Sequence, residues 1–169
     1  MADVVALVVR FFHIMFGIAW IGAIMYGVGV LRRVMPRVEP AARKAAMKQL
    51  LPVVTRYIPG SAVMTIVTGA ILYLYIGVYL AHMNLDAFLG TRWGLTLLAA
   101  LIFSLTAFAL GMVFGVGTAK RILTHLEEPT CEHGAEVGGL TRRFNQAQVV
   151  VLVLGFVIIA LMVYAVAGA

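Results

Sequence analysis

The chain has 169 residues, of which 63% are hydrophobic and 12% are charged, and its formal net charge is +6. A soluble domain carries about 25% charged residues, so this composition excludes an ordinary soluble globular protein. Four apolar stretches stand between short charged segments, and each reaches the roughly 20 residues that a helix needs to cross a membrane. We therefore predict an all-α integral membrane protein, a four-helix bundle that forms a single transmembrane domain over residues 1–169. The expected helices cover residues 4–31, 58–81, 94–119 and 145–167.

The basic residues fall mostly into two segments between the expected helices. Seven lie between residues 32 and 56, four lie between residues 120 and 143, and only Arg10 and Arg92 lie elsewhere. Cytoplasmic loops of membrane proteins are enriched in Lys and Arg. We therefore expect both basic segments in the cytoplasm, with both termini and the 82–92 loop outside, in a bacterial inner membrane. This distribution indicates membrane topology and no nucleic-acid partner. Asp3 stands where a signal peptide carries basic residues, so we expect the first helix to be retained.

The two basic segments differ in composition. The first contains EPAARKAAMKQLLP, in which Pro40 suits a first helical turn and Pro52 suits a helix stop. It is expected to be either a short helix on the anionic inner leaflet or a solvated linker. The second segment contains glycine and acidic residues and is expected to be irregular. Its His125, Cys131 and His133 lack the paired-ligand spacing of a zinc site, so we expect no metal there.

A weak internal repeat links the two halves of the chain. The segment YGVGVLRR (26–33) closes the first helix, and FGVGTAKR (114–121) closes the third. Likewise TRYI (55–58) precedes the second helix, and TRRF (141–144) precedes the fourth. Two interpretations remain: two helical hairpins related by an axis along the membrane normal, or chance matching between similar apolar helices.

The first helix contains a histidine deep in its apolar run. His13, Gly17, Trp20 and Ile24 share one face of a helix that advances 100° per residue. Counted from Val4, His13 lies about 13–14 Å below the outer surface, close to the middle of the bilayer. Ionisable groups at that depth usually mark a functional site. Two interpretations stay open: an imidazole that binds a metal, and a neutral imidazole that is hydrogen-bonded to a neighbouring helix.

The residues around His13 allow the same two kinds of interpretation. Gly17 leaves space either for close helix packing or for the edge of a macrocycle, and Trp20 either packs or stacks on a ring ligand. Arg10 and Arg92 either extend to the outer interface or bind the carboxylates of a ligand. If His13 is an axial ligand of a haem b, outward propionates would meet both arginines.

The second axial ligand of such a haem stays open. Met162 lies at about 10 Å depth and is a candidate, whereas His82 would lie about 13 Å too shallow. A five-coordinate iron, or a His13 supplied by a second subunit, is equally consistent with the sequence.

The stretch HIMFGIAWIG resembles the first-helix motif of a group of small membrane haem proteins. This group includes the copper-resistance D-like family, the HemJ-type protoporphyrinogen oxidases and the membrane domain of bacterial membrane-bound urate oxidases. The part GIAWIG is most similar to the urate oxidase domain, and RYIPGSAVMTIVTGAILY in the second helix resembles the broader group. The resemblance covers roughly residues 10–75, and it implies that His13 ligates haem.

Other features of the chain differ from these families. HemJ-type enzymes have a lysine soon after the tryptophan of the third helix, whereas TRWGLTLLAA has none after Trp93. The C-x-x-C-H motif of the urate oxidase cytochrome domain is missing from the sequence. Met15 points about 200° away from His13, so no copper site with both residues is evident on this helix.

Three functions are consistent with the sequence. The first is a haem-b membrane protein for electron transfer or small-molecule oxidation, with His13 as the axial ligand. The second is a non-catalytic structural subunit of a larger membrane complex, and the third is a copper or small-solute transporter. Acid–base catalysis is not expected, because the last three apolar runs contain no Asp, Glu or Lys. The expected partner is the lipid bilayer, with a homo-oligomer or a larger complex as further options.

Overall fold

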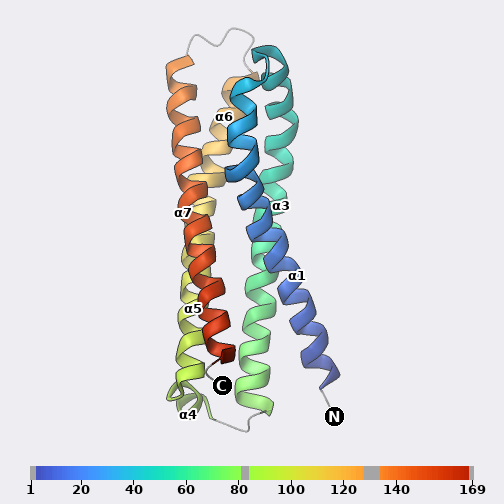
Figure 1. Cartoon of the computed structure of the whole chain (residues 1–169), viewed down its shortest axis with the longest axis vertical. Helices are drawn as coiled ribbons and strands as arrows, with labels where there is room; N and C mark the ends of the chain where they lie inside the picture. Colours follow the sequence, from blue (N-terminus) through green and yellow to red (C-terminus); the bar gives the residue numbers. More distant parts are fainter. Residues whose placement is uncertain (1–2, 81–83, 128–133, 168–169) are drawn as a thin grey trace.

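Four long helices stand side by side in the computed structural model, which is described here for residues 3–80, 84–127 and 134–167 (Figure 1). The first helix is α1 (Val4–Tyr26), which continues through a π-helical turn (Gly27–Leu31), the short α2 (Arg32–Val34) and a 3₁₀ turn (Met35–Arg37). The second is α3 (Pro40–Leu74), which ends in a π-helical turn at Tyr75–Leu80. Both helices begin at an acidic cap, because Asp3 and Glu39 accept hydrogen bonds from backbone N–H groups of the first turn.

The third and fourth long helices form the other half of the bundle. The short α4 (Leu85–Leu89) leads into α5 (Arg92–Leu110), which continues through a π-helical turn (Gly111–Val116) into α6 (Gly117–Glu127). The last helix is α7 (Gly134–Ala167). Packing follows the order α1, α3, α5 and α7 around the bundle, so α1 and α5 lie diagonally opposite each other.

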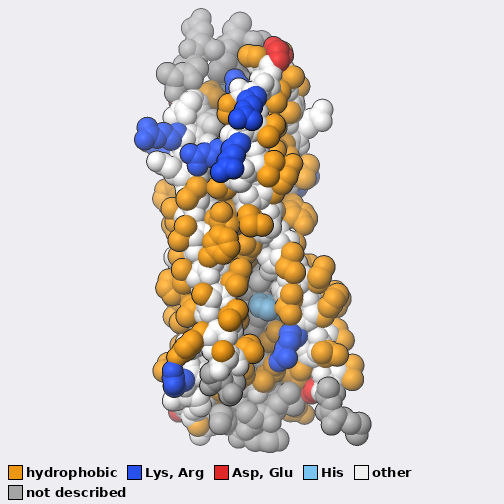
Figure 2. All heavy atoms as spheres, in the orientation of Figure 1, with side chains coloured by type: hydrophobic (Ala, Val, Ile, Leu, Met, Phe, Trp, Pro, Cys, Tyr) orange, Lys and Arg blue, Asp and Glu red, His pale blue; other side chains and the backbone are white. Residues whose placement is uncertain are grey.

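The all-α class is confirmed, and all four helices are long and apolar enough to cross a membrane. Figure 1 shows both chain ends and α4 at one end of the bundle. Figure 2 shows hydrophobic side chains over the middle of the visible face, and Lys and Arg mostly toward the opposite end. We call the end with most of the Lys and Arg side chains the basic end, and the end with both chain termini the terminal end. The assignment of the basic end to the cytoplasm stays a prediction.

The second helix begins at Pro40, not at residue 58, so the prediction of Pro40 in a first helical turn is confirmed. The predicted stop at Pro52 is wrong, and the segment is neither a separate short helix nor a linker. Pro52 and Pro59 lie inside α3 and do not stop it. The segment before Pro52 is held by packing: Leu51 is 2% exposed and belongs to a cluster with Ile122 and Leu140. Burial of this face stabilises a helix through two prolines, and local sequence rules do not include that contribution.

The second basic segment is also more helical than expected. The third long helix begins at Arg92 and reaches Glu127, and α7 begins at Gly134 rather than at residue 145. The segment from 134 to 144 is helical because Leu140 and Phe144 pack in the same cluster as Leu51. Residues 81–83 and 128–133 lie outside the described residues, and they include His82, Cys131 and His133.

The internal repeat stays a prediction. Each copy of the glycine-valine segment adjoins a π-helical turn, which spans Gly27–Leu31 in the first half and Gly111–Val116 in the second. When the two copies are aligned, Gly27 corresponds to Gly115. The first π-helical turn begins at Gly27, whereas the second begins at Gly111, four residues before the corresponding position. The two halves therefore differ in detail at their most similar segment.

The central core lies between His13 and the basic end of the bundle. Trp20 and Ile24 of α1 pack there with Ala62, Ala107 and Val151, so all four long helices meet in one cluster. The first turns of α1 contact fewer helices, and Phe11 is 58% exposed. Figure 1 shows the N-terminal half of α1 diverging from α7. This divergence leaves His13 on the part of α1 that rests mainly on α3.

Candidate functional site around His13

The His13 imidazole makes a hydrogen bond with the backbone of the neighbouring helix. Its Nδ1 lies 2.9 Å from the carbonyl oxygen of Thr65 in α3. A carbonyl oxygen only accepts hydrogen bonds, so Nδ1 carries the proton and donates it. In a neutral imidazole the lone pair then lies on Nε2, and no hydrogen bond reaches this atom from residues 3–80, 84–127 or 134–167. The fold therefore fixes the tautomer and leaves one nitrogen as a potential metal ligand.

Gly69 makes room for this contact. It lies one turn beyond Thr65 on α3, on the same face. A Cβ atom at Gly69 would lie only 2.8 Å from Cε1 and 3.2 Å from Nδ1 of His13. Any side chain at this position would occupy the space that the ring now fills. Glycine at residue 69 therefore permits this close approach, and any larger residue would force the imidazole to shift.

A strip of hydroxyl side chains on α3 faces α1. Ser61, Thr65 and Thr68 are all buried, and each hydroxyl donates to a carbonyl of its own helix. Thr68 Oγ1 also lies 3.3 Å from His13 Nδ1 and acts as a second acceptor, because its own proton goes to Met64. Two acceptors therefore lie at Nδ1, the Thr65 carbonyl oxygen and the Thr68 hydroxyl oxygen. None of the three side chains of the strip is titratable in the physiological range.

The other residues on the His13 face, Gly17, Trp20 and Ile24, pack against protein. A Cβ atom at Gly17 would lie 3.8 Å from Cγ2 of Thr65, which is an ordinary contact distance, so Gly17 rests against α3. Trp20 is 3% exposed and lies in the central core. The close-packing interpretation therefore describes Gly17 and Trp20.

The two outer arginines are not brought together. Arg92 begins α5, donates a hydrogen bond to the Tyr164 hydroxyl of α7, and lies 5.8 Å from the centre of that ring. Arg10 is exposed on α1, the helix diagonally opposite α5. A ligand beside His13 would meet Arg10 one turn outward along the same helix, whereas Arg92 already has an aromatic partner.

Met162 lies at the same level of the bundle as His13. Ile21 of α1 and Gly155 of α7 are in contact, which fixes the register of these two helices. His13 is eight residues outward from Ile21 and Met162 is seven residues outward from Gly155, which correspond to about 12 Å and about 10.5 Å. Met162 also shares a face with Gly155. The register thus places Met162 within about 2 Å of the level of His13 along the bundle, and its role as a ligand stays a prediction.

Figure 2 shows a histidine, coloured pale blue, in a hollow on the terminal half of the bundle, between hydrophobic side chains. The imidazole is half-buried rather than sealed in the core.

The sequence did not single out Thr65, Thr68 or Gly69. Their spacing with Ser61 places all four on one face of α3, which is a recognisable pattern of small and hydroxyl residues. That pattern indicates a packing face of a membrane helix. It gives no information on which residue of α1 will lie opposite.

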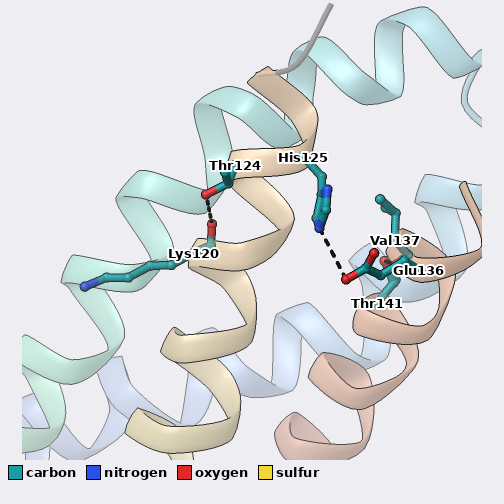
Figure 3. A network of polar contacts seen from close by, with 6 residues as sticks. All are labelled: Lys120, Thr124, His125, Glu136, Val137 and Thr141. Carbon is teal, nitrogen blue, oxygen red and sulfur yellow. Dashed lines mark hydrogen bonds and ion pairs between the residues drawn. The ribbon is translucent and has the colours of Figure 1, made fainter. Parts of the chain in front are cut away.

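The second histidine in the described part of the chain lies at the basic end. His125 Nε2 on α6 is 3.6 Å from a carboxylate oxygen of Glu136 on α7 (Figure 3). Within residues 3–80, 84–127 and 134–167, no group of three His, Cys, Asp or Glu side chains is placed to hold a metal ion. Cys131 and His133 lie outside the described residues, so their relation to His125 stays a prediction.

Asp3 ties the start of α1 to the end of α3. The Tyr75 hydroxyl donates a 2.7 Å hydrogen bond to the Asp3 carboxylate, whose other oxygen caps α1. These hydrogen bonds, with that of Tyr75 the largest contribution, lower the pKa of the Asp3 carboxyl.

Comparisons of the chain with protein families, curated proteins and solved structures found no match. The resemblance of residues 10–75 to membrane haem proteins therefore stays a prediction, and the function has to be argued from the site itself.

Proposed function

We propose that this chain is a membrane haem-b protein in which Nε2 of His13 is an axial ligand. The observation that carries the proposal is the hydrogen bond from Nδ1 to the Thr65 carbonyl. Histidines that ligate metals commonly donate their other N–H group to a carbonyl or carboxylate, which fixes the tautomer and orients the ring. Here a backbone atom supplies that partner, and Gly69 lets the ring reach it.

The residues predicted to bind the haem would hold different parts of it. The apolar side chains of the terminal half would form the shell around the ring, and Arg10 is the first candidate to bind a propionate. Arg92 is the second candidate and would have to exchange its contact with Tyr164. Met162, level with His13 on α7, would be the candidate for a second iron ligand.

The iron of a bound haem would supply one-electron chemistry, and the protein would tune it. His13 would hold the iron, the Thr65 carbonyl would raise the basicity of its imidazole, and the apolar side chains around the site would exclude water. The apolar runs of α3, α5 and α7 contain no Asp, Glu or Lys that could exchange protons with a substrate. Electron transfer or oxidation of a small molecule near the terminal end fits this chemistry better than acid–base catalysis.

A second candidate function rests on the same hydrogen bond. The Thr65 carbonyl satisfies one ring nitrogen, and Gly69 and Gly17 give close contact between α1 and α3. His13 would then join two helices of a structural subunit in a larger membrane complex, without a cofactor.

One experiment separates these functions. The chain is purified in detergent, and visible spectra are recorded in the oxidised and dithionite-reduced states, together with iron and copper content. We expect a Soret band that is lost in His13→Ala and kept in His125→Ala, the matched control at the other end of the bundle. A coloured His13→Ala protein would refute the ligand assignment. A colourless wild-type protein would refute the haem proposal. Without metal it would favour the structural subunit, and with stoichiometric copper it would favour the transporter.

A further inference from the structure

A groove with charge at one end runs along the basic half of the bundle. It lies between α5–α6 and α7 and has a volume of about 590 Å³. Arg121 and Arg143 line it toward the basic end, one from each side. Val113, Phe114 and Val150 line it toward the middle of the bundle. The groove thus combines two cations with an apolar floor.

The order of these residues along the helices matches the depth profile of a membrane leaflet. Arg121 lies eight positions after Val113, which corresponds to about 12 Å along the helix axis. On α7 the groove begins at Leu140, which is buried in the cluster with Leu51, and the lining residues then run inward through Arg143, Gln146, Ala147 and Val150. Both walls therefore change from cationic to apolar in the same direction.

The apolar part of the groove is open toward the surroundings. Val113 is 63% exposed, Phe114 is 54% exposed and Val150 is 48% exposed. Among the described residues that line the groove, none is acidic. The cations at its end consequently have no carboxylate within the groove to neutralise them.

We propose that this groove binds one anionic glycerophospholipid of the leaflet at the basic end. Its phosphate lies between Arg121 and Arg143, with Gln146 as a further hydrogen-bond donor, and one acyl chain lies along Val113 and Phe114. Arginine binds phosphate oxygens in pairs, and basic pockets between membrane helices commonly hold anionic headgroups. A free phosphate would leave the apolar floor uncovered. This inference does not depend on the haem proposal.

The chain offers a matched control for the two arginines. Lys120 and Arg142 are the immediate neighbours of Arg121 and Arg143, are exposed, and do not line the groove. Figure 3 shows Lys120 pointing away from α7. The double variants R121Q/R143Q and K120Q/R142Q therefore remove the same charge from the same helices, and only the first changes the groove.

A third variant fills the groove without changing charge. A Cβ atom at Gly117 would have only Met112 O within 4 Å, at 3.8 Å, and Gly117 lines the groove, so we expect the side chain of G117L to project into the groove. G117L also keeps the proposal testable if the arginine variant fails to fold.

The experiment measures binding of phosphatidylglycerol to the detergent-solubilised chain by native mass spectrometry. Titrations are run at low salt and after exchange from about 1 M salt, where the Debye length is about 3 Å and general surface attraction is screened. We expect one tightly retained lipid, about tenfold weaker binding in R121Q/R143Q and in G117L, and no change in K120Q/R142Q. Phosphatidylcholine should bind more weakly than phosphatidylglycerol, and inorganic phosphate should not compete.

Several results would overturn the proposal. An equal loss in the two double variants would mean that general surface charge, not the groove, holds the lipid. Unchanged binding in G117L would place the acyl chain elsewhere, and displacement by inorganic phosphate would identify a simple anion site. A wild-type chain that retains no lipid but dimerises with concentration would assign the groove to a second copy.

Discussion

Substitution of Gly69 by alanine tests the geometry around His13 most directly. The new Cβ atom would lie 2.8 Å from Cε1 of the imidazole, so the ring must retreat by about 0.6 Å to reach an ordinary contact distance of about 3.4 Å. The same movement lengthens the 2.9 Å hydrogen bond to Thr65 toward about 3.5 Å, where little of it remains. The lost hydrogen bond costs about 0.6–1.5 kcal/mol in the free energy of unfolding.

The matched control is Gly60→Ala on the same helix, where a Cβ atom would have no neighbour within 4 Å. Both substitutions gain the helix propensity of alanine, roughly 0.5–1 kcal/mol. We therefore expect Gly69→Ala to be about 1–2 kcal/mol less stable than Gly60→Ala, with the excess above the hydrogen bond due to overpacking.

Unfolding by SDS in mixed micelles, followed by tryptophan fluorescence, measures these differences. Each substitution is made with His13 present and with His13→Ala, so that the double-mutant cycle isolates the contact with the imidazole. We expect the difference between Gly69→Ala and Gly60→Ala to disappear when His13 is replaced. A difference that persists without the imidazole would refute the assigned contact between α1 and α3.

Two further predictions concern how α1 is held. In Gly155→Leu the side chain would collide with Ile21, whose Cδ1 would lie 2.5 Å from a Cβ atom there, so we expect a loss of about 1–3 kcal/mol in SDS unfolding. Ile21→Ala should restore most of that loss, and failure to do so would contradict the α1–α7 register. For Asp3, whose folded-state pKa is lowered, the carboxylate stabilises the fold above its unfolded pKa, and this contribution disappears as pH falls through the folded pKa. Tyr75→Phe should raise the pKa of Asp3 in a carboxyl carbon NMR titration, and an unchanged pKa would exclude the hydrogen bond as its cause.

The sequence by itself determined the fold class and the unusual residue. Composition and run length are enough for four apolar helices, because a backbone in hydrocarbon must satisfy its hydrogen bonds within each helix. An imidazole deep in such a run is visible without any structure, since few side chains there are polar.

Only the tertiary structure decided what surrounds that imidazole. The hydrogen-bond partner of His13 is the backbone carbonyl of Thr65. The imidazole can reach this carbonyl because residue 69, which lies 56 positions after His13 in the chain, is a glycine. No local pattern encodes that pairing, because it follows from the register in which α1 packs on α3. The course of α3 through Pro52 was misjudged for the same reason: burial of Leu51 against α6 and α7 stabilises the helix more than the proline disrupts it. Long-range packing therefore decided both the extent of the helices and the environment of His13.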